Sequence, residues 1–129
     1  MGYIGIIEVG SLVGEVLTHI DTDEGNTEIM LTTASGRIIR IYHHQDCCER
    51  VSIESTEGNW HSLIGKVIIE ASEDIDPQGE PPPKYPESWT RTALTFKVDD
   101  ATVISRWIGE SNGYYSESVE IEDVTVGER

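Results

Sequence analysis

A seven-residue pattern occurs twice in this chain and limits the folds that the chain can adopt. SLVGEVL (residues 11–17) and SLIGKVI (62–68) share the order Ser, Leu, apolar, Gly, charged, Val, apolar. In both halves the same types of segment then follow: a pair of apolar, β-branched segments, a polar corner, and a short segment of alternating polarity. The 129 residues therefore read as one domain built from two copies of a β unit, about residues 11–54 and 62–122.

The segments that follow each heptapeptide have the periodicity of strands rather than of helices. In ERVSIE (49–54), Val51 and Ile53 alternate with polar residues, which is typical of a strand with one buried face. The matching segment in the second half is SESVEIE (116–122). Strands are expected at residues 27–33, 37–44, 49–54, 66–71, 90–98, 101–108 and 116–124.

Short turns account for most of the remaining chain. SLVG (11–14) and NWHSLIG (59–65) each predict one short helical turn that ends at a glycine. Residues 76–88 hold all five prolines and predict a surface loop. Tight turns between strands are expected at Ser35-Gly36 and Asp99-Asp100.

A single unit of this kind cannot bury its apolar face by itself. We therefore expect a mainly β fold in which two pseudo-repeated antiparallel units pack as a small sandwich or barrel, with one or two short helical turns. In this arrangement HHQDCC (43–48) and GESNGYYS (109–116) are equivalent corners at which the chain reverses.

Charge is the dominant global property of the chain. Twenty-four acidic residues against nine basic ones leave a formal net charge of −15. This charge repels nucleic acids and anionic membranes, so we expect no direct binding to either, and it favours encounter with a basic protein surface. The N-terminal MGYIGII lacks the basic segment of a signal peptide, and two adjacent cysteines are not a disulfide framework. Both features predict a cytoplasmic protein.

The cluster of histidine, aspartate and cysteine in the first corner raises the question of a metal site. His43 and His44 are neighbours on a strand, so their side chains leave on opposite faces and cannot chelate one ion together. A site built from His44, Asp46 and one cysteine would need His19 or His61 to complete it, and nothing in the sequence brings either close. We expect no metal and no cofactor.

Thiol catalysis is not expected at the same corner. The carboxylates of Asp46 and Glu49 flank Cys47 and Cys48 and disfavour a thiolate. Because a disulfide between adjacent cysteines is strained, we expect one buried thiol and one thiol at the corner. The chain also has no phosphate-binding glycine loop and no catalytic triad spacing, so we expect a binding protein rather than an enzyme.

Aromatic residues mark the second corner. Trp107 leads into it, and Tyr114 and Tyr115 lie at its tip. Adjacent strand residues point to opposite faces, so one tyrosine should be packed and the other free. A free tyrosine beside Asn112 and Glu117 suits contact with a protein partner or stacking on a small ligand, although both rings could instead cover the open end of the sheet.

Three strings of the sequence resemble a known family: YHHQDCCERVSIE, LIGKVI with EASED, and RWIGESNGYYSESVEIE. They are similar to a family of small uncharacterised proteins of phages and prophages, classed as a domain of unknown function, over residues 10–124. The resemblance implies a protein that acts inside a bacterial cell. By analogy with other small acidic phage proteins, it suggests an inhibitor of a host enzyme or of antiviral defence, anti-CRISPR-like or mimicking nucleic acid.

Two functions are compatible with these features. The first is an acidic inhibitor that binds a basic surface of a host protein through its acidic faces and two corners. The alternative is a protein that binds or sequesters a nucleotide signal between the corners, which requires free arginines among Arg37, Arg40, Arg91 and Arg106. Exposed sheet edges are also compatible with a homodimer. The candidate binding residues are His44, Asp46, Cys47, Cys48, Glu49, Trp107, Glu110, Asn112, Tyr114, Tyr115 and Glu117.

Overall fold

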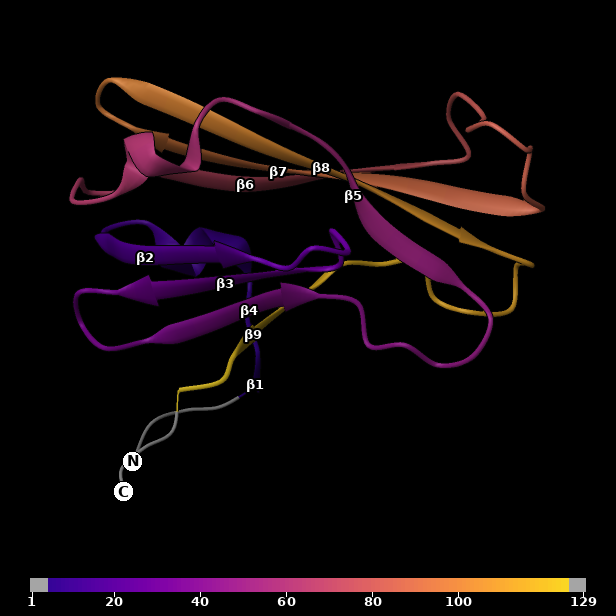
Figure 1. Cartoon of the computed structure of the whole chain (residues 1–129), viewed down its shortest axis with the longest axis horizontal. Coiled ribbons are helices and arrows are strands. Elements are labelled where there is room, and N and C mark those ends of the chain that lie inside the picture. The colour runs from indigo at the N-terminus through magenta and orange to yellow at the C-terminus, as the bar shows by residue number, and fades with distance from the viewer. Residues whose placement is uncertain (1–4, 126–129) are drawn as a thin grey trace.

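Two antiparallel sheets packed face to face make up the molecule (Figure 1). The structure, a computed structural model, describes residues 5–125, so Met1–Ile4 of the N-terminal segment considered above lie outside the described residues. The expected mainly β fold is confirmed, and its form is a small sandwich. In the described residues the helical segments are two 3-10 turns, η1 (Val9–Leu12) and η2 (Trp60–Leu63), and neither could span a membrane.

The sheets contain five and four strands. The first has the order β1 (Gly5–Ile6), β9 (Glu120–Asp123), β4 (Ile38–Tyr42), β3 (Glu28–Thr33), β2 (Leu17–Thr22). The second has the order β5 (Arg50–Glu57), β8 (Ala101–Ser111), β7 (Ser88–Val98), β6 (Glu70–Pro77).

Each sheet takes its strands from both halves of the sequence, which differs from the expected packing of one unit per sheet. Strand β5 is the last strand of the first half but pairs with β8 of the second, and β9 is the last strand of the second half but pairs with β4 of the first. The pairings are equivalent in register, because Ile121 lies opposite Ile41 and Ile53 lies opposite Trp107. The two corners were expected to reverse the chain as hairpins. Instead, each corner is a connection that crosses from one sheet to the other (Figure 1).

The repeated heptapeptides bond to one another where the sheets meet. The N–H of Gly14 donates to the carbonyl of Ile68 over 2.8 Å, and the N–H of Gly65 donates to the carbonyl of Leu17 over 2.9 Å. Both glycines have positive φ, +96° and +82°, which L side chains rarely adopt. The glycine at the centre of each heptapeptide therefore ends a 3-10 turn, as predicted, and ties one half to the other.

Strand boundaries differ from the predicted ones mainly around β6. Residues 66–69 lie before this strand rather than in it, and β6 instead extends to Pro77, into the expected loop. A proline is tolerated there because β6 is an edge strand and lacks a neighbour on one side. Strands β1 and β2 were not among the expected ones. The predicted turns at Ser35-Gly36 and Asp99-Asp100 are confirmed.

The core lies between the sheets and is built from the alternating positions of the strands. Leu94, Phe96 and Val98 point into the core from β7 of the second sheet. Ile39 and Ile41 point into the same core from β4 of the first sheet. The remaining large, fully buried side chains are Leu12, Leu17, Ile29, Leu31, Leu63, Ile68, Val103 and Trp107.

Candidate functional site

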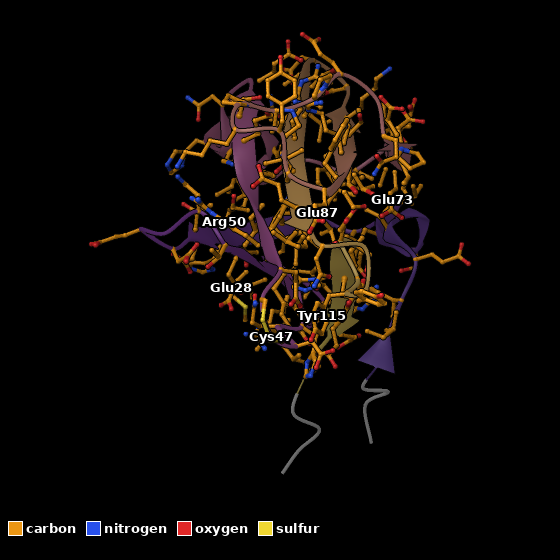
Figure 2. The ribbon with its side chains drawn as sticks, turned by 90° about the vertical axis from the view of Figure 1, so that its right-hand side faces the viewer. Glu28, Cys47, Arg50, Glu73, Glu87 and Tyr115 are labelled. Atoms are coloured by element: carbon orange, nitrogen blue, oxygen red, sulfur yellow. A yellow bond between two sulfur atoms is a disulfide. The ribbon has the colours of Figure 1, made fainter. Side chains whose placement is uncertain are left out.

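The two corners meet at one end of the sandwich. The first corner comprises residues 43–49, between β4 and β5, and the second comprises residues 112–118, between β8 and β9. The Nδ1 atom of His43 lies 2.8 Å from the carbonyl oxygen of Ser118, so a hydrogen bond joins them. Figure 2 shows Cys47 of the first corner and Tyr115 of the second at the same end of the molecule.

A buried histidine–glutamate pair fixes the first corner. The Nε2 atom of His43 lies 2.6 Å from Oε2 of Glu49, and the two side chains are only 3% and 0% exposed. Both ring nitrogens of His43 have an oxygen partner, the Ser118 carbonyl on one side and the Glu49 carboxylate on the other. The imidazole is therefore fully engaged inside the protein and offers no nitrogen to a ligand.

Glu49 also organises the backbone of its own corner. Its carboxylate accepts hydrogen bonds from the N–H groups of Asp46 (2.7 Å) and Cys47 (2.9 Å). The hydrogen bond from His43, against the opposing effect of burial and with help from these backbone donors, lowers the pKa of Glu49 from 4.5 to about 2. Glu49 is therefore an internal anchor and does not offer its carboxylate to a partner.

A second carboxylate fixes the second corner in the corresponding way. Glu117 accepts a hydrogen bond of 2.7 Å from the Thr90 hydroxyl and another from the Ser111 hydroxyl. Burial alone would raise the pKa of Glu117, but donation from Ser111, Ser88 and Thr90 outweighs burial and lowers the pKa. Unlike Glu49, Glu117 is only half-buried and contacts no basic side chain among the described residues.

The cysteines differ from the expectation of one buried thiol and one thiol at the corner. A disulfide joins Cys47 to Cys48, and both residues are exposed (Figure 2). The backbone N–H groups of Asp46 and Cys47 point inward to the carboxylate of Glu49, and the two cysteine side chains lie on the surface. Trp107, which was expected among the binding residues, is not at the surface. It is fully buried, and its Nε1 donates a hydrogen bond of 3.0 Å to the Ser105 hydroxyl.

The other candidate residues lie at or near the surface. Tyr114 is 89% exposed and Tyr115 is half-buried. The expected strand alternation does not explain this difference, because both residues lie in the bend between β8 and β9. Asn112 accepts a hydrogen bond of 3.0 Å from the N–H of Tyr114 and so shapes the corner. Glu110 is half-buried on β8, opposite Arg50. His44 and Asp46 are exposed beside the cysteines.

No cluster of three or more metal-binding side chains occurs within residues 5–125. His19 lies on β2 and His61 in η2, so neither belongs to the first corner that would have needed it. The exposed part of that corner offers His44 and Asp46 without a third unengaged ligand, because both sulfur atoms are in the disulfide.

The four arginines that a small anionic ligand would require are all paired with carboxylates. Arg37 contacts Glu15 at 3.0 Å and Asp123 at 3.2 Å, and Arg40 contacts Glu28 at 2.8 Å. The two arginines of the second half pair with glutamates of β5. These pairs are Arg91 with Glu54 and Arg106 with Glu57.

Two surface pockets lie near the corners. One, of about 250 Å³, lies between β5 and the proline-rich loop; its cations, Arg50 and Lys84, are balanced by Glu54 and Glu110. The other, of about 300 Å³, is built by the second corner against β6 and β7. Its lining residues are Ile75, Ser88, Thr90, Thr92, Gly113, Tyr115, Ser116, Glu117 and Ser118.

Sequence reasoning missed the buried partners of the corners, although strand alternation contains part of the signal. His43 continues the inward positions Ile39 and Ile41, and Glu49 precedes the inward positions Val51 and Ile53. Both polar residues therefore have the parity of core residues. The hydroxyl groups that bind Glu117 carry a weaker signal. Ser88 and Thr90 alternate in phase with the buried Leu94, but nothing local links them to Glu117, which lies 27 residues after Thr90.

Comparison with known proteins gives one family. No curated protein and no solved structure matches the chain. A family model described as a domain of unknown function (DUF7448) matches residues 10–121, which is most of the chain. This protein therefore belongs to the DUF7448 family.

Proposed function

We propose that this protein is a small acidic binding protein of phage type that engages the basic surface of a bacterial host protein and inhibits it, as an anti-defence protein or a mimic of nucleic acid. The observation that carries the proposal is the distribution of ion pairs. Most of the few described basic side chains are bound to carboxylates of the same chain, so they do little to offset the large acidic excess elsewhere on the surface.

Most described basic residues are engaged in this way. Ion pairs involve Arg37, Arg40, Lys66, Arg91, Lys97 and Arg106. Each pair cancels a positive charge locally, and the net charge of −15 therefore arises from the remaining carboxylates. On the edge strand β6, for example, Glu73, Asp74 and Asp76 are exposed and make no ion pair with another residue of the described range 5–125. Such a surface attracts a cationic partner over a distance of about 10 Å at moderate salt.

The alternative, a pocket for a nucleotide signal, has less support. Each of the four arginines that the ligand would need contacts a carboxylate, and an anionic ligand would have to displace it. The His43 ring is in direct contact with the backbone carbonyl of Ser118 where the corners meet, so a ligand between the corners would have to break this hydrogen bond.

Affinity capture from a bacterial lysate tests the proposal. The tagged protein should retain a basic host protein at low salt and release it steeply as salt rises, because the association is electrostatic. Replacement of Glu73, Asp74 and Asp76 by Gln or Asn should reduce capture by about tenfold or more, the effect of losing roughly 1.4 kcal/mol of binding.

The matched control removes the same charge elsewhere. Replacement of the exposed Glu8, Asp21 and Glu24 by Gln or Asn leaves the β6 carboxylates in place and should leave capture nearly unchanged. Capture of no basic protein by the wild type, or capture that is insensitive to salt, would contradict the proposed function.

A further inference from the structure

The pocket beside Glu117 lies where the inward face of β7 changes character. At one end of this strand the inward positions are apolar and form the core, with Leu94 and Phe96 fully buried. At the other end the same face carries only hydroxyl side chains, Ser88, Thr90 and Thr92, which line the pocket. A face built only for packing would continue with apolar residues, so this end of the sandwich is adapted to a polar group.

Glu117 supplies the charge in this pocket. Its two carboxylate oxygens have room for about four hydrogen bonds, and Thr90 and Ser111 donate one to each oxygen. The carboxylate therefore keeps acceptor capacity toward the pocket. Hydrogen bonds from neutral hydroxyls hold the pKa of Glu117 below its ordinary value despite the burial, so the group is ionised at neutral pH.

No positively charged residue lines the pocket to balance this charge. The half-buried ring of Tyr115 forms part of the wall, and the face of such a ring attracts cations. Ile75 on β6 adds an apolar contact suited to the aliphatic stem of a long side chain. A carboxylate beside an aromatic ring and an aliphatic side chain matches the two parts of a lysine or arginine side chain, its cationic group and its aliphatic stem.

We propose that the pocket between the second corner and strands β6 and β7 receives one basic side chain of the protein partner, with its cationic group on Glu117 and its stem against Tyr115 and Ile75. This inference rests on the proposed function and specifies how the basic partner is recognised. The volume of about 300 Å³ is at the lower end of the roughly 300–1,000 Å³ range of small-ligand pockets, which suits a single side chain.

The probe for this proposal is N-acetyl-arginine amide, titrated into the full-length, isotopically labelled protein and followed by amide NMR shifts. We expect saturable shifts concentrated at Gly113, Tyr115 and Glu117. N-acetyl-citrulline amide has nearly the same shape without the charge, and it should produce none of these saturable shifts. The neutral probe separates recognition of the charge from simple filling of the pocket.

Two variants locate the interaction, and one controls for charge. Glu117→Gln keeps the shape of the side chain and should weaken binding of the arginine probe by about tenfold or more, because a charge-assisted hydrogen bond is lost. Tyr115→Leu leaves Glu117 in place and should weaken binding severalfold. Glu24→Gln removes the same charge at an exposed site outside the pocket and should bind the probe as the wild type does.

The proposal is overturned by the absence of saturable shifts at the pocket, by equal binding of the citrulline probe, or by equal binding to Glu117→Gln and the wild type. The amide spectrum of each variant reports directly whether it is folded. These outcomes differ from failure of the proposed function. If Glu117→Gln still captured a basic host protein with full affinity, the proposal for the pocket would be rejected, while the proposed function of the acidic surface would stand.

Discussion

His43 and Glu49 show how strongly single buried polar residues determine this fold. His43 reaches from the first sheet to the backbone of the second corner, and Glu49 holds His43 and the turn that contains the disulfide. Removal of either partner leaves the other as a buried polar group without its hydrogen-bond partner, which costs more than the hydrogen bond contributes when intact. The contact between the two corners therefore depends on this pair.

The pH dependence of stability follows from Glu49. Its pKa in the folded protein is about 2, below the ordinary 4.5, so its contribution to stability is fully present above about pH 5 and is lost as the pH falls toward 2. We predict that Glu49→Gln lowers the free energy of unfolding at pH 7 and makes its decline between about pH 5 and pH 2 shallower. Urea unfolding at several pH values measures both.

Some acid sensitivity should remain in this variant. Asp23 and Asp123 also have lowered pKa values, the first chiefly through its hydrogen bond from Thr27 and the second through bonds from Thr125 and Arg37 that outweigh burial. The exposed Glu24→Gln should follow the wild-type curve throughout. If Glu49→Gln also followed the wild-type curve, the carboxylate would not be the anchor of the first corner.

At the scale of elements, the second corner packs tightly across β8. A Cβ atom added at Gly109 would lie 2.4 Å from the carbonyl oxygen of Glu117, closer than any tolerated contact. We predict that Gly109→Ala destabilises the protein by about 1–3 kcal/mol, the usual cost of overpacking, and shifts the amide resonances of the second corner.

Gly10→Ala is the matched control for this substitution. The nearest atom to a Cβ at Gly10 is the carbonyl oxygen of Ala71, at an ordinary 3.8 Å. Its free energy of unfolding should therefore change little. A Gly109→Ala variant as stable as Gly10→Ala would mean that the second corner does not rest on β8 in solution.

The elements could be predicted from the sequence to the extent that their signal is local. Alternation in ERVSIE and the Asp99-Asp100 turn each depend on a few neighbouring residues, and both are confirmed. The sheet to which a strand belongs is not a local property. The alternation around Val51 indicates that one face of β5 is buried. Pairing with β4 or with β8 would satisfy this pattern equally well. The path of the first corner, which crosses to the second sheet, determines that the partner is β8.

The site was less predictable than the fold for the same reason. Glu49 and Glu117 were identified as equivalent from the sequence, but their partners come from distant elements: Ser118 lies 75 residues from His43, and Thr90 lies 27 residues from Glu117. The disulfide between Cys47 and Cys48 was also missed, since strain argued against it.

At the scale of the molecule, the exchange of β5 and β9 makes the two halves dependent on each other. Without the other half, residues 1–58 would contain β5 but not its partner β8, and residues 59–129 would contain β9 but not its partner β4. We predict that each fragment alone is unfolded and that mixing them yields a 1:1 complex with β-sheet circular dichroism. A fragment that folds alone as a monomer would contradict this interdependence.

The charge of the whole molecule should also be visible in its stability. With a net charge of −15, self-repulsion opposes the compact state, and salt screens it. Exposed ion pairs such as Lys66 with Asp100 contribute little that salt could remove. We predict that the melting temperature rises by a few degrees between about 0.01 M and 0.5 M NaCl. A fall over this range would mean that the ion pairs outweigh the repulsion.

The acidic surface of the whole molecule is proposed to bind a basic protein. Native mass spectrometry of the protein purified at low salt from bacterial cells tests this proposal most directly. We expect a near-stoichiometric complex with a basic host protein that dissociates as the ammonium acetate concentration rises. A chain that instead retains a small molecule, and no protein at any salt concentration, would contradict it.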